Sequence, residues 1–235
     1  MLVVFASTHD AIAQAIVSAW APWDAALCSP ADLSTPGWRH YVGASEAAAA
    51  VIAGQIMPAT EITGVLTRFP AVQPEMLANI ATADRSYVAA EMTAFPIAFV
   101  STLSCKVLNR PSAGALCGPA WRPEQWIRAA ARLGIPVRPR RRSIRLNAPA
   151  EPEADLAVEL TVIGNRVFGA VEAPLAGWAL SLARAAGVGL LSLGFTRQAS
   201  GFELATVNPS SDLNTPDRLD AAREFLLSDA EGLGP

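Results

Sequence analysis

The sequence predicts an α/β protein in two parts, an N-terminal parallel-sheet domain followed by a small α+β domain. Over residues 1–137, short apolar segments of strand character alternate with amphipathic helical segments, which is the pattern of βαβ units around a parallel sheet. Residues 138–155 change to an Arg/Pro-rich run and then a Glu/Pro-rich run, which indicates a linker. Residues 156–235 contain strand pairs with helices between and after them, which is typical of an α+β domain.

The first part begins with a buried strand, Leu2–Ala6, whose apolar run ends at the polar residues that start with Ser7. Asp10 is placed to cap a helix, because its carboxylate can accept from the first free backbone N–H groups. The apolar face of that helix comprises Ile12, Ile16, Val17 and Trp20. Further strands are predicted at Ala25–Cys28, Glu61–Leu66, Lys106–Asn109 and Ile135–Val137, and helices at Pro74–Leu103 and Pro123–Leu133.

The last part opens with two β-type runs on either side of the turn Ile163-Gly164-Asn165, which predicts a hairpin. A helix over Gly177–Ala186 is expected to end at Gly187, because glycine accepts the left-handed conformation that follows many helices. A second strand pair, Leu190–Thr196 and Phe202–Val207, surrounds Ser200-Gly201. The final helix is predicted over Asp217–Leu227.

Composition excludes several classes of protein. With 51% hydrophobic and 17% charged residues, the 235-residue chain is no disordered regulator, and a net charge of −3 argues against nucleic acid as the main partner. No apolar run reaches the roughly 20 residues of a membrane span, and the N-terminus lacks the basic region of a signal peptide. Three cysteines without C-x-x-C spacing give neither a disulfide framework nor a metal-ligand pattern. We therefore expect a cytoplasmic protein that binds no membrane.

Several segments, in order, resemble ATP-grasp proteins, in particular the branch of ribosomal-protein glutamate ligases and of ligases that cyclise microviridin-type peptides. Val4–Ala13 is similar to the first strand and helix of that branch, and Ile62–Pro70 to a segment ending in an arginine, here Arg68. The other similar segments are Val107–Pro111, Trp121–Trp126, Leu133–Pro136, Glu159–Phe168, Gly189–Thr196 and Leu204–Pro209. The resemblance implies a pre-ATP-grasp-like domain with a connecting helix (1–137), a linker (138–155) and a truncated remnant of the ATP-grasp C-terminal domain (156–235).

The chain departs from this family where the family binds nucleotide. The resemblance implies two lysines, a glycine-rich flap and an acidic hinge between Pro136 and Glu159, yet this stretch is short and contains neither lysine nor glycine. The magnesium carboxylates of the family fall at Thr196 and Thr206, and of that ligand set only Asn208 remains. Mg²⁺ that bridges phosphates requires hard anionic oxygen ligands, which threonine does not supply.

These departures predict a non-catalytic ATP-grasp-like protein without catalytic residues, metal or cofactor. Its expected role is to bind another protein or a peptide, such as a full-length ligase or the peptide substrate of one, in a peptide-modification or biosynthetic pathway. The alternative is an active ATP-dependent carboxylate–amine ligase that uses ATP and Mg²⁺, with linker arginines in place of the lysines, Asn208 as a ligand, and Glu172 or Glu203 recruited. A third interpretation is an oligomer in which another chain completes the site.

Two groups of residues are candidate binding sites. Five linker arginines suit a phosphate, a carboxylate-rich peptide or an acidic surface, because guanidinium binds such groups with two parallel hydrogen bonds; the alternative is a solvated linker. They are Arg138, Arg140, Arg141, Arg142 and Arg145. Trp121 and Trp126 flank a helix start and form either a partner-binding face or core. His9 and Asp10 could form a general-base pair, although a capping role for Asp10 is simpler.

Overall fold

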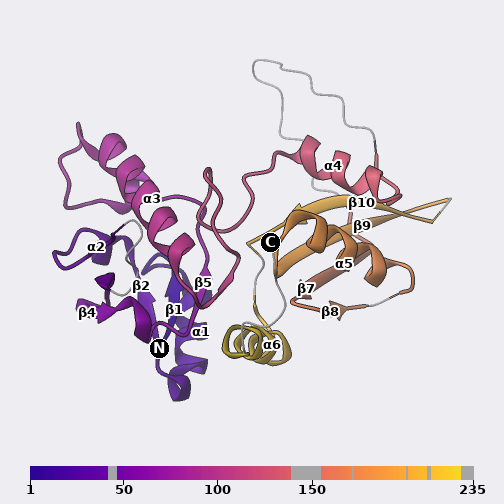
Figure 1. Cartoon of the computed structure of the whole chain (residues 1–235). Coiled ribbons are helices and arrows are strands. Elements are labelled where there is room, and N and C mark those ends of the chain that lie inside the picture. The colour runs from indigo at the N-terminus through magenta and orange to yellow at the C-terminus, as the bar shows by residue number, and fades with distance from the viewer. Residues whose placement is uncertain (42–46, 139–154, 171, 200, 211–212, 229–235) are drawn as a thin grey trace. The chain divides into compact units, whose positions relative to one another are not determined.

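A computed structural model describes the chain except for residues 42–46, 139–154, 171, 200, 211–212 and 229–235 (Figure 1). The chain divides into two compact units. Unit 1 comprises Met1–Ala120 together with Asp212–Pro235, and unit 2 comprises Trp121–Ser211. Unit 1 contains a four-stranded parallel sheet and unit 2 a four-stranded antiparallel sheet. The predicted fold class is therefore confirmed. None of the helices in the described ranges is long and apolar enough to cross a membrane.

The sheet of unit 1 has the order β2-β1-β5-β6. Its strands are β1 (Leu2–Phe5), β2 (Ala25–Cys28), β5 (Gly64–Thr67) and β6 (Lys106–Leu108). From the central strand β1 the chain passes to β2 on one side, and it returns to β5 on the other. The carboxyl ends of β1 and β5 therefore lie side by side where the direction of winding reverses, which is where open parallel sheets place their ligands.

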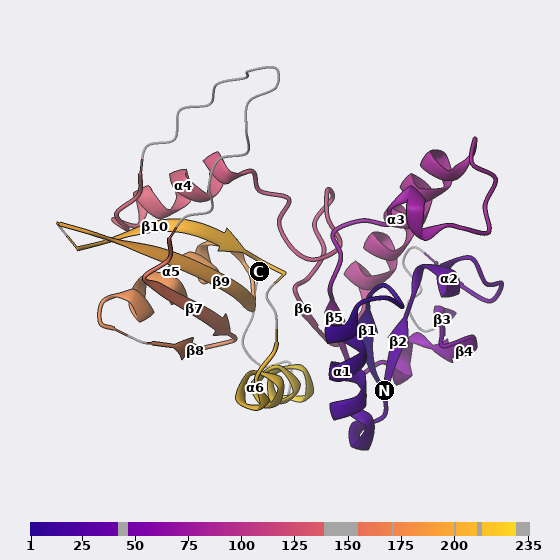
Figure 2. The same ribbon diagram turned by 180° about the vertical axis from the view of Figure 1, so that it is seen from behind.

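Every residue of β1 and β5 is buried, because helices cover both faces of this sheet. Helix α3 (Arg85–Thr102) shares one core with Val3, Phe5 and Val65. Gly64 and Leu2, on the opposite face of the sheet, lie against α6 (Pro216–Leu227). Helix α1 (Ala11–Ala19) packs against β2. Figure 2 shows this helix and the sheet from behind.

Unit 1 also contains shorter elements. Helix α2 (Pro30–Leu33) precedes an antiparallel hairpin of β3 (Ala49–Ile52) and β4 (Gln55–Pro58). Single turns of 3₁₀ helix include η1 (Ala21–Trp23), η3 (Ala59–Glu61) and η4 (Pro74–Met76). The long helix expected over Pro74–Leu103 is thus divided into η4 and α3. The break falls in Leu77–Asp84, where turns replace the helix.

Unit 2 has the sheet order β10-β9-β7-β8. Its strands are β7 (Val158–Ile163), β8 (Arg166–Gly169), β9 (Leu190–Gln198) and β10 (Gly201–Asn208). Helix α5 (Leu175–Ala186) packs on β7 and β9 and ends at Gly187, whose φ of 65° is the expected left-handed conformation. Helix α4 (Pro123–Arg132) packs along β10. The predicted strand Ile135–Val137 is reduced to one bridge, between Val137 and Leu204.

The compact units differ from the expected division at residues 137 and 156. Helix α4 was expected in the first domain, but Trp126 and Ala130 are buried in the core of unit 2. Helix α6 was expected in the second domain, but it packs on β5 and β6 of unit 1. Each helix belongs to the unit whose apolar surface it covers. Its position in the sequence does not determine that unit. Most of the expected linker lies outside the described residues.

Candidate functional site

The candidate site lies on the face of the unit 2 sheet that points away from α5. Side chains alternate along a strand. Leu193 and Phe195 of β9 are buried in the core with α5, so Ser192, Gly194 and Thr196 point to the opposite face. In β10 the residues opposite them are Asn208, Thr206 and Glu203, respectively.

A β-bulge at Ala205 places Thr206 and Asn208 on this outer face. The pairing of β9 with β10 shifts between Leu204, opposite Phe195, and Thr206, opposite Gly194. Without the extra residue, strict alternation would send Thr206 and Asn208 to the same side as Leu204, into the core. Both are instead exposed, and Thr196 is partly exposed. The structure therefore brings Thr196, Thr206 and Asn208 together on one accessible face.

Gly194 allows the two strands to carry these side chains. A Cβ atom on Gly194 would collide with the Thr206 hydroxyl and would lie 2.7 Å from Leu156 Cδ1. On the same face, Thr161 of β7 is opposite Ser192, and the two hydroxyls form a buried hydrogen bond of 2.9 Å. The centre of this face thus carries hydroxyl groups and one amide.

The donors on this face fit a divalent cation poorly. The two threonines are neutral, and Asn208 Oδ1 accepts a hydrogen bond of 2.8 Å from the Ser210 N–H. Two carboxylates share this face: Glu203, opposite Thr196, lies 3.8 Å from Arg138 Nε, and Glu159 of β7 is exposed opposite Gly194. Within the described ranges, no group of three or more His, Cys, Asp or Glu side chains is placed to hold a metal ion. A magnesium ion on ATP requires several anionic oxygens at one point, and this face does not assemble them.

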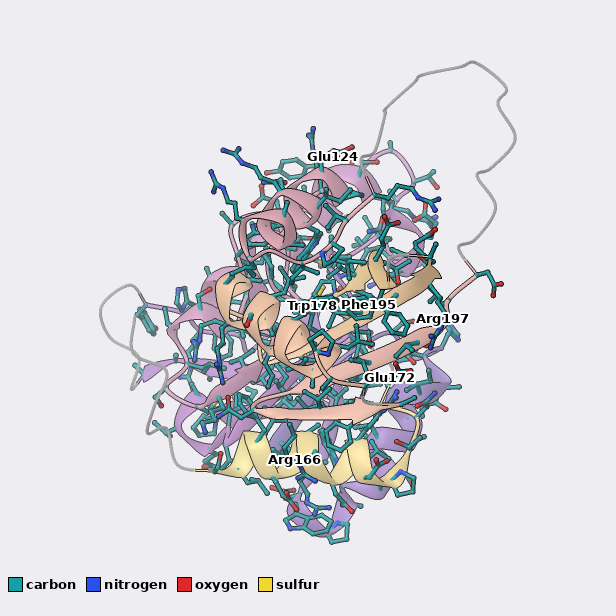
Figure 3. The ribbon with its side chains drawn as sticks, turned by 90° about the vertical axis from the view of Figure 1, so that its right-hand side faces the viewer. Glu124, Arg166, Glu172, Trp178, Phe195 and Arg197 are labelled. Atoms are coloured by element: carbon teal, nitrogen blue, oxygen red, sulfur yellow. The ribbon has the colours of Figure 1, made fainter. Side chains whose placement is uncertain are left out.

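Glu172 lies apart from the three residues. Its Oε1 is 3.4 Å from Arg197 Nη2, and the Arg197 guanidinium stacks over Phe202 at 4.6 Å (Figure 3). Arg197 alternates onto the side of Phe195, where α5 packs. Glu172 therefore belongs to the side of the sheet opposite Asn208, and its recruitment as a ligand beside Asn208 is not supported by this geometry.

The arginine cluster is described only at its first member. Arg138 is exposed and pairs with Glu203. Arg140, Arg141, Arg142 and Arg145 lie outside the described residues, so the anion site stays a prediction.

The two tryptophans lie in contact with each other, their ring centroids 4.7 Å apart. Trp126 is only 5% exposed and belongs to the core of unit 2, so the core alternative describes its position within that unit. The reason is the phase of α4: Trp126 and Ala130 occupy its inner face, one turn apart. Trp121 is half-buried, and a partner role for it stays a prediction.

Asp10 pairs with Arg68 and is a helix cap. Its Oδ1 accepts from the Ala13 N–H at 3.0 Å, and its Oδ2 lies 2.7 Å from Arg68 Nε. Burial raises the pKa of Asp10, but the Arg68 guanidinium and the Ala13 N–H outweigh burial and hold the pKa below its ordinary value. This ion pair was not predicted from the sequence. Both residues follow strands that are neighbours in the sheet, and a prediction of strand order would have revealed it.

Comparison with solved structures shows what the two units resemble together; no family model and no curated protein matches the chain. The macrocyclase MdnC from Microcystis aeruginosa MRC, bound with the precursor peptide MdnA, aligns with a TM-score of 0.69 at 12% identity, covering 97% of this chain and 99% of that one. The chain has the ATP-grasp fold.

Other structures with this fold agree. The ATP-grasp ligase PsnB complexed with a minimal precursor aligns with a TM-score of 0.66 at 13% identity, covering 95% of this chain and 98% of PsnB. A RiPP-associated ATP-grasp ligase from Chryseobacterium gregarium, in complex with ADP and a leader and core peptide, gives 0.65 at 9% identity, covering 96% of both chains. The resemblance seen in the sequence is thus confirmed at the level of the fold, while identities of 9–13% carry no information about residue roles.

Proposed function

We propose that this ATP-grasp-like chain is a non-catalytic cytoplasmic protein that binds a peptide or protein partner in a peptide-modification pathway. The observation that carries the proposal is the outer face of the unit 2 sheet. Thr196, Thr206 and Asn208 are together and accessible there, where the family resemblance implies the magnesium ligands. Neither threonine supplies a carboxylate, and within the described residues no three His, Cys, Asp or Glu side chains are grouped to hold a metal ion.

The missing charge matters because phosphoryl transfer depends almost entirely on positioning and electrostatic stabilisation. Cationic side chains and Mg²⁺ must neutralise the triphosphate, and carboxylates must hold the Mg²⁺. The one lysine of the chain, Lys106, lies in unit 1, where its Nζ is 2.7 Å from Ser228 Oγ and 5.0 Å from the Phe225 ring centroid. It is engaged in holding α6 against β6.

The pathway is inferred from the solved structures that share the fold. MdnC, PsnB and the Chryseobacterium gregarium ligase were each solved with precursor, leader or core peptides. A fold that holds peptides in these proteins supports a peptide or a peptide-modifying enzyme as the partner of this one. The pathway is thus proposed by analogy of fold.

Calorimetric titration with Mg·ATP tests the absence of a nucleotide site. We expect no measurable binding at micromolar concentrations of Mg·ATP. Micromolar binding that disappears in Asn208→Ala would show that the site works and would favour the active-ligase alternative.

A gain-of-function variant tests the cause. Thr196→Asp combined with Thr206→Glu restores two carboxylates on adjacent strands, and we expect it to bind Mn²⁺, detected by loss of the free-ion paramagnetic resonance signal, where the natural chain does not. The matched control is Thr196→Asn with Thr206→Gln, which has similar shape and no charge. Equal Mn²⁺ binding by the natural chain and both variants would contradict the proposal.

A further inference from the structure

Helix α4 has two faces of opposite character. Its inner face, with Trp126 and Ala130, is buried in the core of unit 2. Its outer face is exposed and carries Arg128 and Arg132, four residues apart and therefore on the same side of the helix. Glu124 lies on the exposed side one turn before Arg128 (Figure 3). The packing of the tryptophan fixes which way the arginines point.

These two arginines have no acidic partner among the residues that the structure describes. No carboxylate of that part of the chain lies within 4.0 Å of either guanidinium. Some arginines elsewhere do pair with carboxylates: Arg68 with Asp10, Arg197 with Glu172 and Arg223 with Asp220. The outer face of α4 thus presents two guanidinium groups on one side of the helix. Leu133, at the end of the helix, is 40% exposed.

Charge is divided unevenly between the two units. Unit 2 contains 11 basic and 7 acidic residues, whereas unit 1 contains 7 basic and 14 acidic ones. The net charge of −3 therefore conceals a basic unit and an acidic unit. Such asymmetry indicates an electrostatic partner for the basic part.

We propose that the outer face of α4 is a docking surface for an acidic polypeptide segment in extended conformation. Arg128 and Arg132 are separated by roughly 6 Å along the helix axis, and carboxylates at alternate positions of an extended peptide are separated by about 7 Å. Each guanidinium can bind one carboxylate with two parallel hydrogen bonds. This inference rests on the proposed function, since it names the chemistry of the partner.

Nucleic acid fits this face less well than a peptide. Tight binding to a phosphate backbone draws on about 6–10 phosphate contacts, whereas the face presents two arginines with Glu124 beside them. A short acidic segment needs only two contacts at the spacing that the helix supplies.

Fluorescence anisotropy with a labelled peptide of alternating Glu and Ser tests the surface in the full-length protein. We expect salt-sensitive binding that Arg128→Glu/Arg132→Glu weakens by about tenfold or more. The control Arg166→Glu/Arg184→Glu makes the same change in net charge elsewhere in unit 2 and should retain most of the binding. Arg128→Lys/Arg132→Lys keeps the positive charge but not the planar guanidinium groups. Its affinity for the peptide should lie between those of the natural protein and the Glu variant. Circular dichroism establishes that each variant is folded.

Several results would overturn the proposal. Equal losses in the α4 variant and its control would show only an effect of net charge, and a loss confined to a charge reversal of Arg140–Arg142 would assign binding to the predicted arginine cluster instead. If an oligonucleotide bound more tightly than the peptide and the α4 variant abolished that binding, the partner would be a nucleic acid. A concentration-dependent dimer abolished by the α4 variant would make it a second copy of this chain. Mg·ATP titration of the same samples separates failure of this inference from failure of the non-catalytic proposal.

Discussion

One carboxylate at the end of β1 links three features of unit 1. Asp10 caps α1 through Ala13, pairs with Arg68 after β5, and occupies the edge of the sheet at the reversal of winding. The Arg68 side chain is only 9% exposed. A guanidinium so well buried requires a charged partner. Removing that partner leaves an uncompensated buried charge, which destabilises the fold by more than the ion pair itself stabilises it. The position at which related topologies bind ligands is therefore occupied here by a structural ion pair.

This arrangement predicts how acid affects stability. Since the pKa of Asp10 is lower in the folded protein than in the unfolded chain, its ionised form stabilises the fold at pH values above the unfolded pKa. That contribution is lost as the pH falls through the folded pKa. Asp10→Asn should cost about 1–3 kcal/mol at neutral pH, and the difference from the natural protein should shrink below about pH 4.

Urea unfolding at a series of pH values measures this difference. Glu75→Gln, which changes an exposed carboxylate, is the control and should leave the free energy of unfolding and its pH dependence nearly unchanged. A gap between Asp10→Asn and the natural protein that stays constant down to pH 2 would show that the ion pair does not contribute.

At the scale of elements, a glycine allows the last helix to approach the first sheet. A Cβ atom on Gly64 of β5 would lie 2.9 Å from Leu226 Cβ of α6 and 2.9 Å from Leu2 Cδ2. Helix α6 is also held by Arg223, whose guanidinium stacks 3.8 Å from the Trp23 ring centroid. Close approach and cation–π contacts together bring the C-terminal helix to unit 1.

Substitution of glycine by alanine should therefore have opposite effects at two positions. Gly64→Ala should destabilise the protein by about 1–3 kcal/mol through overpacking. Gly177→Ala, within α5, meets no atom within 4 Å and should stabilise by about 0.5–1 kcal/mol through higher helix propensity. Thermal unfolding checks both, and stabilisation by Gly64→Ala would contradict the close packing of α6 on β5.

At the scale of the whole molecule, the chain leaves unit 1, builds unit 2 and returns. Leu226 of α6 is 1% exposed in unit 1, and Leu182 of α5 is fully buried in unit 2. Helix α6 thus completes unit 1, although the residues of unit 2 separate it from the rest of that unit in the sequence.

Matched cavities test this organisation. Leu226→Ala and Leu182→Ala should each cost about 2–5 kcal/mol. Hydrogen exchange measured by mass spectrometry should localise the first loss to β5 and β6 and the second to β7 and β9. If Leu226→Ala raised exchange in β7 and β9 but not in β5 and β6, the assignment of α6 to unit 1 would be wrong.

Local pattern is sufficient for most of the elements. Strand β2 was predicted with its observed bounds, and the turn at Ile163-Gly164-Asn165 and the end of α5 at Gly187 followed from residue types whose backbone preferences are strong. The hairpin of β3 and β4 was not predicted. Its turn places Ala53 and Gly54 at φ values of 49° and 76°, and alanine gives no signal of a left-handed conformation. The Asp32 carboxylate, which accepts from the Gly54 N–H at 2.8 Å, supports that turn from α2.

The sequence by itself determined the order and type of most elements, the fold class and the absence of a carboxylate at Thr196 and Thr206, because these depend on residue identity and periodicity along the chain. The tertiary structure alone decided which unit owns α4 and α6, that Trp126 is buried while Arg128 and Arg132 are exposed, and that Asp10 meets Arg68. It also decided that the bulge at Ala205 turns Thr206 and Asn208 outward. These outcomes depend on contacts between segments far apart in the chain, and on one extra residue in a strand, which reverses the face of all the residues after it.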